Sequence, residues 1–199
     1  MLFRFADIRE NAERVFNKWL NTYSIIRPSL GLYFSAVSGD HKYLDGKFLA
    51  LAQGLETYHR RTSNETLRDE SEFRSMVASF LWNCPKKNRK WLRGRLYHGN
   101  EINLGQRIKR IIEPYKAYLG NSKQRNKFIR DVVNTRNYLT HYSEELEKDA
   151  VKGSELWSIC QKMEAVFQLH LLQQLGFEDS DIQRILSNNY KLKQKFEEI

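Results

Sequence analysis

The sequence contains few of the features that are typical of secreted proteins, of membrane-spanning proteins or of proteins stabilised by a bound metal ion. Its 199 residues include only two cysteines, Cys84 and Cys160, and three prolines. The cysteines are far apart and neither belongs to a C-x-x-C pair, so we expect two buried thiols in a reducing compartment. No apolar run approaches about 18 residues, and no signal peptide is visible at Met1. These absences predict a cytoplasmic protein without a membrane partner.

The common catalytic signatures are missing as well. The sequence has no G-x-x-x-x-G-K-[ST] loop, no G-x-G-x-x-G after a predicted strand, no H-E-x-x-H and no G-x-S-x-G. The five histidines are dispersed, and no two of them have metal-ligand spacing. The sequence therefore predicts no metal and no cofactor. Any catalysis would then depend on arginine, histidine and carboxylate side chains alone.

Positive charge is the first feature that the sequence has in excess. The 33 lysines and arginines outnumber the 24 acidic residues and give a net charge of +9, which favours a polyanionic partner such as RNA. The densest basic run is "PKKNRKWLRGR", in which a tryptophan is interleaved. There the cations can follow an RNA backbone while the ring stacks on a base. The alternative is a solvated loop with a buried tryptophan. The residues concerned are Lys86, Lys87, Arg89, Lys90 and Trp91.

Helical periodicity predicts an all-α bundle with little or no β-strand. Apolar residues recur every three or four positions in several stripes, one of which runs from Phe73 to Cys84 and ends at Pro85. A long helix is expected near the C-terminal end, with Ser154 as its N-cap and Gly176 just after its end. Only the segment 27–37 is ambiguous between helix and strand. Because no long linker interrupts the chain, one compact domain is the default.

The spacing Arg-x-x-x-x-His occurs twice, as "RGRLYH" and as "RNYLTH". A motif this short is weak by itself, so the context has to separate the two copies. Arg93 lies among glycines and other cations, which indicates a solvated basic loop. Arg136 instead continues the apolar stripe of Phe128 and Val132, so the inward face of that helix is predicted to end in a cation. A buried guanidinium is costly alone, and we expect an acid or a cleft beside it.

Two segments together resemble a known family. "FLALAQGLETYHRR" followed by "RNYLTHY" is similar to the HEPN superfamily, in detail to the Apea-like HEPN domains at the C-terminal end of larger bacterial proteins. The resemblance covers most of residues 43–175. It implies a helical bundle, frequent homodimerisation and, in active members, metal-independent RNA cleavage linked to phage defence or toxin activity. It also assigns residues 1–42 to a helical junction with an upstream domain of the same polypeptide, and residues 43–199 to the HEPN domain.

The resemblance also assigns residues to roles. Its motif arginine falls on Arg136, the following polar residue on Asn137 and the catalytic histidine on His141, while Tyr142 occupies a position that is often aromatic. The segment "GLETYHRR" supplies three further residues, of which the last is expected to contact RNA: Glu56, His59 and Arg60.

The residues themselves agree with part of this assignment. Glu56 lies beside an apolar stripe and can reach Arg136, either to present it to a cleft or only to lock two helices together. His141 suits proton transfer, and Arg136 suits stabilisation of negative charge during attack by a 2′-hydroxyl. Residues five apart on a helix point about 140° away from each other. Their convergence therefore requires fraying near Thr140 or a second copy of the chain.

These observations predict a metal-independent endoribonuclease that acts as a homodimer. Two alternatives from other functional classes remain open. One is a catalytically silent HEPN module that binds RNA or a nucleotide, and the other is a helical dimerisation or sensing module of a larger defence protein.

Overall fold

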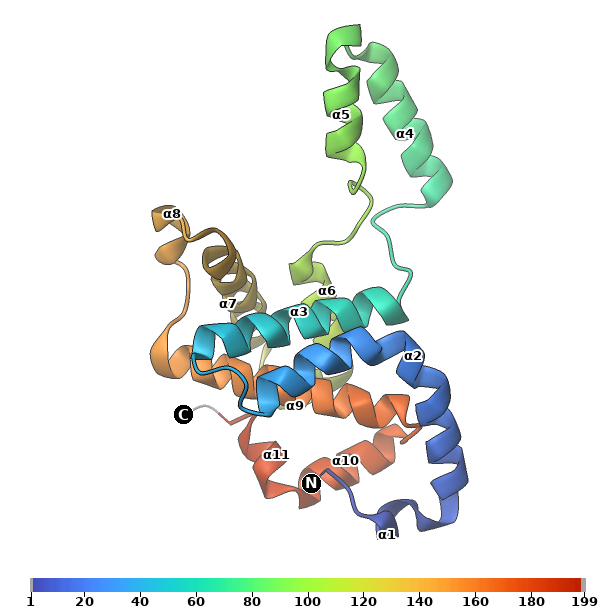
Figure 1. The fold of residues 1–199 in the computed structure, drawn as a ribbon, viewed down its shortest axis with the longest axis vertical. Coiled ribbons are helices and arrows are strands. Elements are labelled where there is room, and N and C mark those ends of the chain that lie inside the picture. Colours follow the sequence, from blue (N-terminus) through green and yellow to red (C-terminus); the bar gives the residue numbers. More distant parts are fainter. Residues whose placement is uncertain (1, 198–199) are drawn as a thin grey trace.

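The computed structural model describes residues 2–197, which form helices joined by short connections (Figure 1). No β-strand is present in that range, where a single isolated bridge pairs Thr66 with Glu101, so the all-α prediction is confirmed. None of these helices is long and apolar enough to cross a membrane. The α-helices are α1 (Phe5–Ile8), α2 (Ala12–Val37), α3 (Leu44–Thr62), α4 (Glu70–Asn83), α5 (Arg89–Leu96), α6 (Leu104–Ile112), α7 (Ser122–His141), α8 (Glu144–Glu147), α9 (Gly153–Gln174), α10 (Asp179–Asn188) and α11 (Tyr190–Gln194). The 3-10 segments are η1 (Arg9–Asn11), η2 (Lys86–Asn88) and η3 (Glu113–Tyr118).

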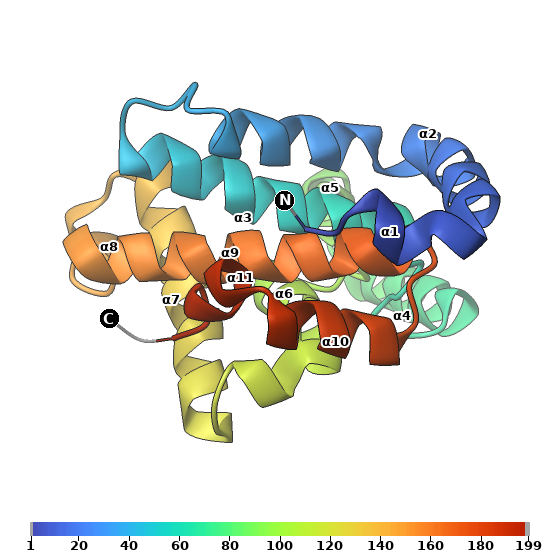
Figure 2. The ribbon, with the colours of Figure 1, turned by 90° about the horizontal axis from the view of Figure 1, so that it is seen from below.

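The core lies between α2, α3 and α9, which run side by side, while α7 crosses them (Figure 2). Phe48, Leu51 and Leu55 of α3 are fully buried there because they share one face of the helix. From α9, Phe167 stacks on Tyr33 of α2, with ring centroids 4.5 Å apart and planes 8° from parallel. This packing fixes α3, which carries Glu56 at the edge of the core.

The ambiguous segment 27–37 is helical along its whole length and forms the second half of α2. Ile26, Leu30 and Tyr33 follow one helical face into the core, so packing against α3 decides the outcome although Pro28 lies inside the helix. Residues 2–37 are thus mostly helical, and their second half shares its core with α3. The assignment of residues 1–42 to a junction with an upstream domain stays a prediction.

The ends of α9 agree with the sequence only at the C-terminal side. Gly176 follows the last turn with φ of +85°, a left-handed conformation that glycine adopts without strain, as predicted. The prediction of Ser154 as N-cap is wrong, because Lys152 occupies that position. The chain enters the helix through Gly153 at φ of +59°, one residue before the serine.

Helices α4 and α5 form a hairpin that stands away from the bundle (Figure 1). We call residues 70–96 the arm. The stripe from Phe73 to Cys84 does form a helix that ends before Pro85, but no residue of α4 or α5 is buried, and Phe80 is 48% exposed. Of the two thiols predicted to be buried, only that of Cys160 is, whereas Cys84 is half-buried. Periodicity predicts an apolar face, but it cannot say whether anything covers it.

A buried carboxylate on α9 connects the end of α11 to the bundle. Glu164 lies between Lys47 of α3, whose Nζ is 2.5 Å from Oε1, and Lys195, which pairs with Oε2. A buried carboxylate is stable only when cations or hydrogen bonds satisfy it. The two lysines therefore connect α3, α9 and the end of α11 through one residue.

Candidate functional site

Helix α7 places Arg136 beside the buried line of the helix and not on it. The helix begins at an Asn121–Gln124 capping box and buries Phe128, Val132, Thr135 and Leu139 along one face. The expectation that the inward face ends in a cation is therefore wrong by one position. Thr135 is buried instead, because its hydroxyl oxygen accepts a hydrogen bond from the Val151 N–H at 3.0 Å. Arg136 is left at the edge, where its side chain is partly exposed.

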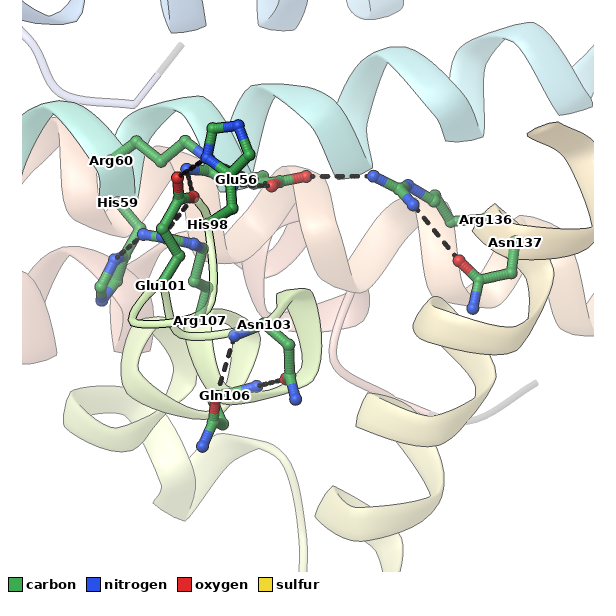
Figure 3. Close-up of polar contacts among 10 residues, drawn as sticks. All are labelled: Glu56, His59, Arg60, His98, Glu101, Asn103, Gln106, Arg107, Arg136 and Asn137. Carbon is green, nitrogen blue, oxygen red and sulfur yellow. Dashed lines mark hydrogen bonds and ion pairs between the residues drawn. The ribbon is translucent and has the colours of Figure 1, made fainter. Parts of the chain in front are cut away.

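The guanidinium of Arg136 is held on two sides (Figure 3). Its Nη2 lies 3.5 Å from Oε2 of Glu56 on α3, and its Nη1 donates to Oδ1 of Asn137 at 3.2 Å. The Glu56 side chain is mostly buried, whereas the Arg136 side chain is 37% exposed. The contact that the sequence predicted between these two residues is present. Asn137 orients the arginine in this arrangement and has no described contact with His141.

Glu56 is also the first member of a longer chain of charges. Its Oε1 accepts two hydrogen bonds from Arg60, at 3.1 Å from Nε and 3.0 Å from Nη2, and Arg60 pairs in turn with Glu101. The other oxygen of Glu101 lies 2.5 Å from Nδ1 of His98. Hydrogen bonds from Arg60 and His98 hold the pKa of Glu101 below its usual value, so this carboxylate stays charged. The chain of charges runs from α7, across α3, to His98 and Glu101 (Figure 3). These two residues lie in the connection between α5 and α6, which is the base of the arm.

His59 lies behind this chain and is buried. Burial, together with the nearby charge of Arg107, lowers the pKa of His59, so its neutral ring accepts a hydrogen bond from Arg107 at 3.2 Å. Arg107 is itself buried, and its Nη2 is 3.9 Å from Glu101. His59 therefore supports Arg107 and does not face the exposed side of Arg136.

Sequence reasoning missed Arg107 and Glu101. A signal for the first was available, because Arg107 lies between Leu104 and Ile111 on the apolar face of α6, which begins at a capping box of Asn103 and Gln106. A cation on such a face predicts a partner in the same way as Arg136 does. Glu101 had no comparable signal, since it lies in a short connection outside any helix.

His141 is the last residue of α7, and its side chain is exposed. The helix stays intact to its end, where the Thr140 hydroxyl donates to the Arg136 carbonyl at 2.7 Å and the Tyr142 N–H donates to Tyr138 at 2.6 Å. Tyr142 follows in a left-handed conformation, with φ of 51°, and its side chain is exposed. The structure therefore shows α7 as regular helix through Thr140 and His141. Arg136 and His141 point about 140° apart.

The earlier arginine–histidine pair does not form one site. Arg93 lines a groove between α4 and α5 together with Phe73 and Val77. His98 lies at the base of the arm, where its contact is with Glu101. His98 is nevertheless connected to Arg136, because its partner Glu101 also pairs with Arg60 of the chain of charges. The sequence context favours the later arginine–histidine pair.

The basic run predicted to bind RNA lies at the turn of the arm and along α5. Trp91 is 63% exposed, so the alternative of a buried tryptophan is wrong. Arg89 is used within the arm, because its guanidinium donates to the carbonyl oxygens of Cys84 at 3.0 Å and Trp82 at 3.1 Å. The lysines of the run remain exposed: Lys86, Lys87 and Lys90.

Residues 2–197 contain no group of three or more histidine, cysteine, aspartate or glutamate side chains that could hold a metal ion. The family model described as Apea-like HEPN matches residues 49–181, which is more than half of the chain. The matched range contains Glu56, the arm, Arg136 and His141. No curated protein and no solved structure matches the chain.

Proposed function

The chain belongs to the Apea-like HEPN family, and we propose that it is a metal-independent endoribonuclease whose active site is centred on Arg136 and His141. The observation that carries this proposal is the state of Arg136. Its guanidinium is fixed by Glu56 and Asn137 while the side chain remains 37% exposed, on the helix that ends in the exposed His141. A fixed and accessible cation is suited to the charge that develops on a reacting phosphodiester.

The proposed reaction is an internal transesterification of RNA. The 2′-oxygen bonds to the adjacent phosphorus while the bond from phosphorus to the 5′-oxygen breaks. One proton leaves the 2′-hydroxyl and another reaches the departing 5′-oxygen. His141 transfers a proton in this scheme, because histidine changes charge near neutral pH. Arg136 stabilises the negative charge that develops on the phosphate oxygens.

A homodimer completes the site in this proposal. Because α7 directs Arg136 and His141 to different sides, one phosphate cannot contact both of them in a single chain unless the helix is distorted. A second copy can supply the missing histidine, with Arg136 of one chain facing His141 of its partner. Symmetric pairing of this kind is the most common form of oligomer.

The proposed RNA path runs from the arm to Arg136. Lys86, Lys87 and Lys90 offer positive charge on the arm, and Arg60 lies at its base in direct contact with Glu56. Phosphate contacts of this kind give affinity without sequence preference. Such an enzyme would act in phage defence or as a toxin, which is the biological setting that the family suggests.

A second candidate function is a silent HEPN module that binds RNA without cutting it. The divergence of Arg136 and His141 favours this candidate, since the two groups are not assembled within one chain. The ion pair of Arg136 with Glu56 is then a link between α3 and α7 with no catalytic part.

The test is RNA cleavage by the purified protein in excess EDTA. The expected products end in 2′,3′-cyclic phosphate, because the ribose hydroxyl is the nucleophile. A single 2′-deoxy substitution at the cut site should block cleavage, and His141→Ala should remove it. RNA binding without cleavage would support the silent module, and activity that needs a divalent ion would contradict the proposed mechanism.

A further inference from the structure

The outer side of α5 combines two residues that are unfavourable on an exposed helix. Trp91 is 63% exposed, and Gly94 lies three positions later, on the same face of the helix. A Cβ atom at Gly94 would meet no atom within 4 Å, and Gly94 and Trp91 line the same open hollow. Glycine is one of the least favourable residues inside a helix. The arm therefore exposes most of an aromatic side chain beside an empty position.

Cations surround this empty position. Lys87, Lys90, Trp91, Gly94 and Arg95 line an open hollow of about 620 Å³. The guanidinium carbon of Arg95 is 6.0 Å from the centroid of the Trp91 ring, at the limit of a cation–π contact. The hollow thus offers one aromatic surface with positive charge on its border.

The opposite side of α5 has a different environment. Arg93 and Leu96 face α4 and form the groove with Phe73 and Val77. Apolar side chains of α4 and α5 line that side of the arm, whereas Trp91 is largely exposed on the other side. Substitutions at Trp91 and Gly94 are therefore expected to affect binding more than the packing of the arm.

We propose that the hollow is a subsite for one unpaired nucleotide of single-stranded RNA. The base stacks on the indole of Trp91 in the space that Gly94 leaves open, and the flanking phosphates lie on Lys87, Lys90 and Arg95. The occupant follows from charge complementarity, because it must present both a flat ring and negative charge to this surface. A base inside a duplex has both faces covered by its neighbours and cannot occupy the hollow. This inference rests on the proposed function in taking RNA as the ligand.

The matched substitutions are Gly94→Leu and Gly94→Ala. Leucine fills the space beside the ring, whereas alanine leaves most of it open, and both are better helix formers than glycine. Trp91→Ala removes the ring itself. Every one of these variants keeps all charges of the hollow, so the salt dependence of binding should not change. Circular dichroism of each variant checks that the helices persist.

The measurement is the dissociation constant of a single-stranded RNA oligonucleotide, made in a His141→Ala background so that the RNA stays intact. One stacked base contributes about 1–3 kcal/mol, so Trp91→Ala should weaken binding by roughly 5- to 150-fold. Gly94→Leu should also weaken it at least about fivefold, while Gly94→Ala stays near the parent. A duplex of the same sequence should bind the parent and Trp91→Ala equally.

The subsite is overturned if Trp91→Ala and Gly94→Leu bind the single strand as tightly as the parent, if the parent does not bind it, or if the duplex loses as much affinity as the single strand. These outcomes are independent of catalysis. If the unsubstituted protein fails to cut RNA in EDTA while the two variants lose affinity, the proposed enzyme fails and the subsite stands. If the unsubstituted protein cuts RNA in EDTA while Trp91→Ala and Gly94→Leu bind as tightly as the parent, the proposed enzyme stands and the subsite fails.

Discussion

The guanidinium of Arg136 lies 3.5 Å from the carboxylate of Glu56, although one residue belongs to α7 and the other to α3. The same carboxylate accepts two hydrogen bonds from Arg60. One carboxylate therefore contacts two arginines, and Arg60 pairs with Glu101 as well. Among residues 2–197, Arg136 has no second carboxylate of this kind and its side chain stays partly exposed, so a phosphate diester can approach it. The rigid support of Arg136 limits the reorganisation needed to bind that anion.

Removal of either proposed catalytic group should stop RNA cleavage without unfolding the protein. We expect His141→Ala to lower the rate by about 10²- to 10⁴-fold and Arg136→Ala by about 10²- to 10³-fold. The matched controls from the earlier motif, Arg93→Ala and His98→Ala, should lower it less than tenfold. Single-turnover cleavage of a labelled RNA measures the chemical step. If His98→Ala is the inactive variant, the wrong arginine–histidine pair has been assigned.

Neutralising the lysines of the arm should weaken RNA binding and make it less sensitive to salt. Replacing Lys86, Lys87 and Lys90 by glutamine should reduce the slope of log affinity against log salt by about 0.7 for each phosphate of a single strand that the arm no longer binds. Arg89 is kept in this variant because it closes the turn of the arm. Titrations at several salt concentrations give the slope. An unchanged slope would assign the lysines to a solvated surface.

The buried Glu164 should contribute strongly to stability. Its substitution by glutamine leaves Lys47 and Lys195 without a counter-charge, at sites where their side chains are only 23% and 20% exposed. Because both lysine side chains are partly exposed to solvent, we expect the free energy of unfolding to fall by roughly 1–3 kcal/mol, which is less than for a fully buried pair. Urea unfolding measures this change. Glu155→Gln, an exposed position on the same helix, should change it by less than about 0.5 kcal/mol.

Two buried histidines should make the fold sensitive to mild acid. Burial lowers the pKa of His59 and of His170, while in the unfolded chain both titrate near about 6.5. The unfolded state therefore binds more protons as the pH falls below that value, and the free energy of unfolding decreases until the folded histidines also protonate. Urea unfolding at pH 7.5, 6 and 5 should show the decrease.

The His170→Gln variant provides the check on this assignment, because it removes one of the two titrations. Its free energy of unfolding should depend less on pH between 7 and 5 than that of the parent. Equal pH dependence in His170→Gln and the parent would contradict the explanation.

The two thiols should react at very different rates. Burial raises the pKa of Cys160 to about 12, whereas Cys84 is half-buried on the arm. Only the thiolate reacts with alkylating agents, so native protein at pH 8 should be labelled at Cys84 alone, and Cys160 should react only after unfolding. Mass spectrometry after brief labelling locates the modified residue. Labelling of Cys160 in the native protein would show that α9 opens more readily than its packing indicates.

The sequence predicts most of the helices but not what surrounds them. Helical spacing identifies the face of α4 from Phe73 to Cys84 correctly, yet that face is covered only in part, by α5, because its helix lies on the arm. On α7 the periodicity is ambiguous by one residue, and the hydrogen bond from Val151 to Thr135 decides which position is buried. A local pattern specifies neither the neighbours of a helix nor the path of the chain between helices.

The part of the candidate site that could be predicted from the sequence is a single ion pair between two residues at the edge of the core. These residues are Arg136 and Glu56, and each lies beside an apolar stripe. The partners of Glu101 were not predictable, since it meets Arg60 across 41 positions and joins His98 to the same group. Only the fold brings the connection at the base of the arm onto α3.

The attachment of the arm has a consequence for how this protein can change over evolutionary time. The arm joins the bundle through two connections that are tied to each other, where Asn100 accepts from the Arg68 N–H at 3.0 Å and donates to the Arg68 carbonyl at 3.1 Å. Above this closure, α4 and α5 contribute no buried side chain to the bundle. Mutations in the arm therefore leave the packing around Glu56 and Arg136 unchanged. The sequence of this hairpin can therefore diverge, and the molecules that the arm binds can change with it, while Glu56 and Arg136 in the bundle are kept.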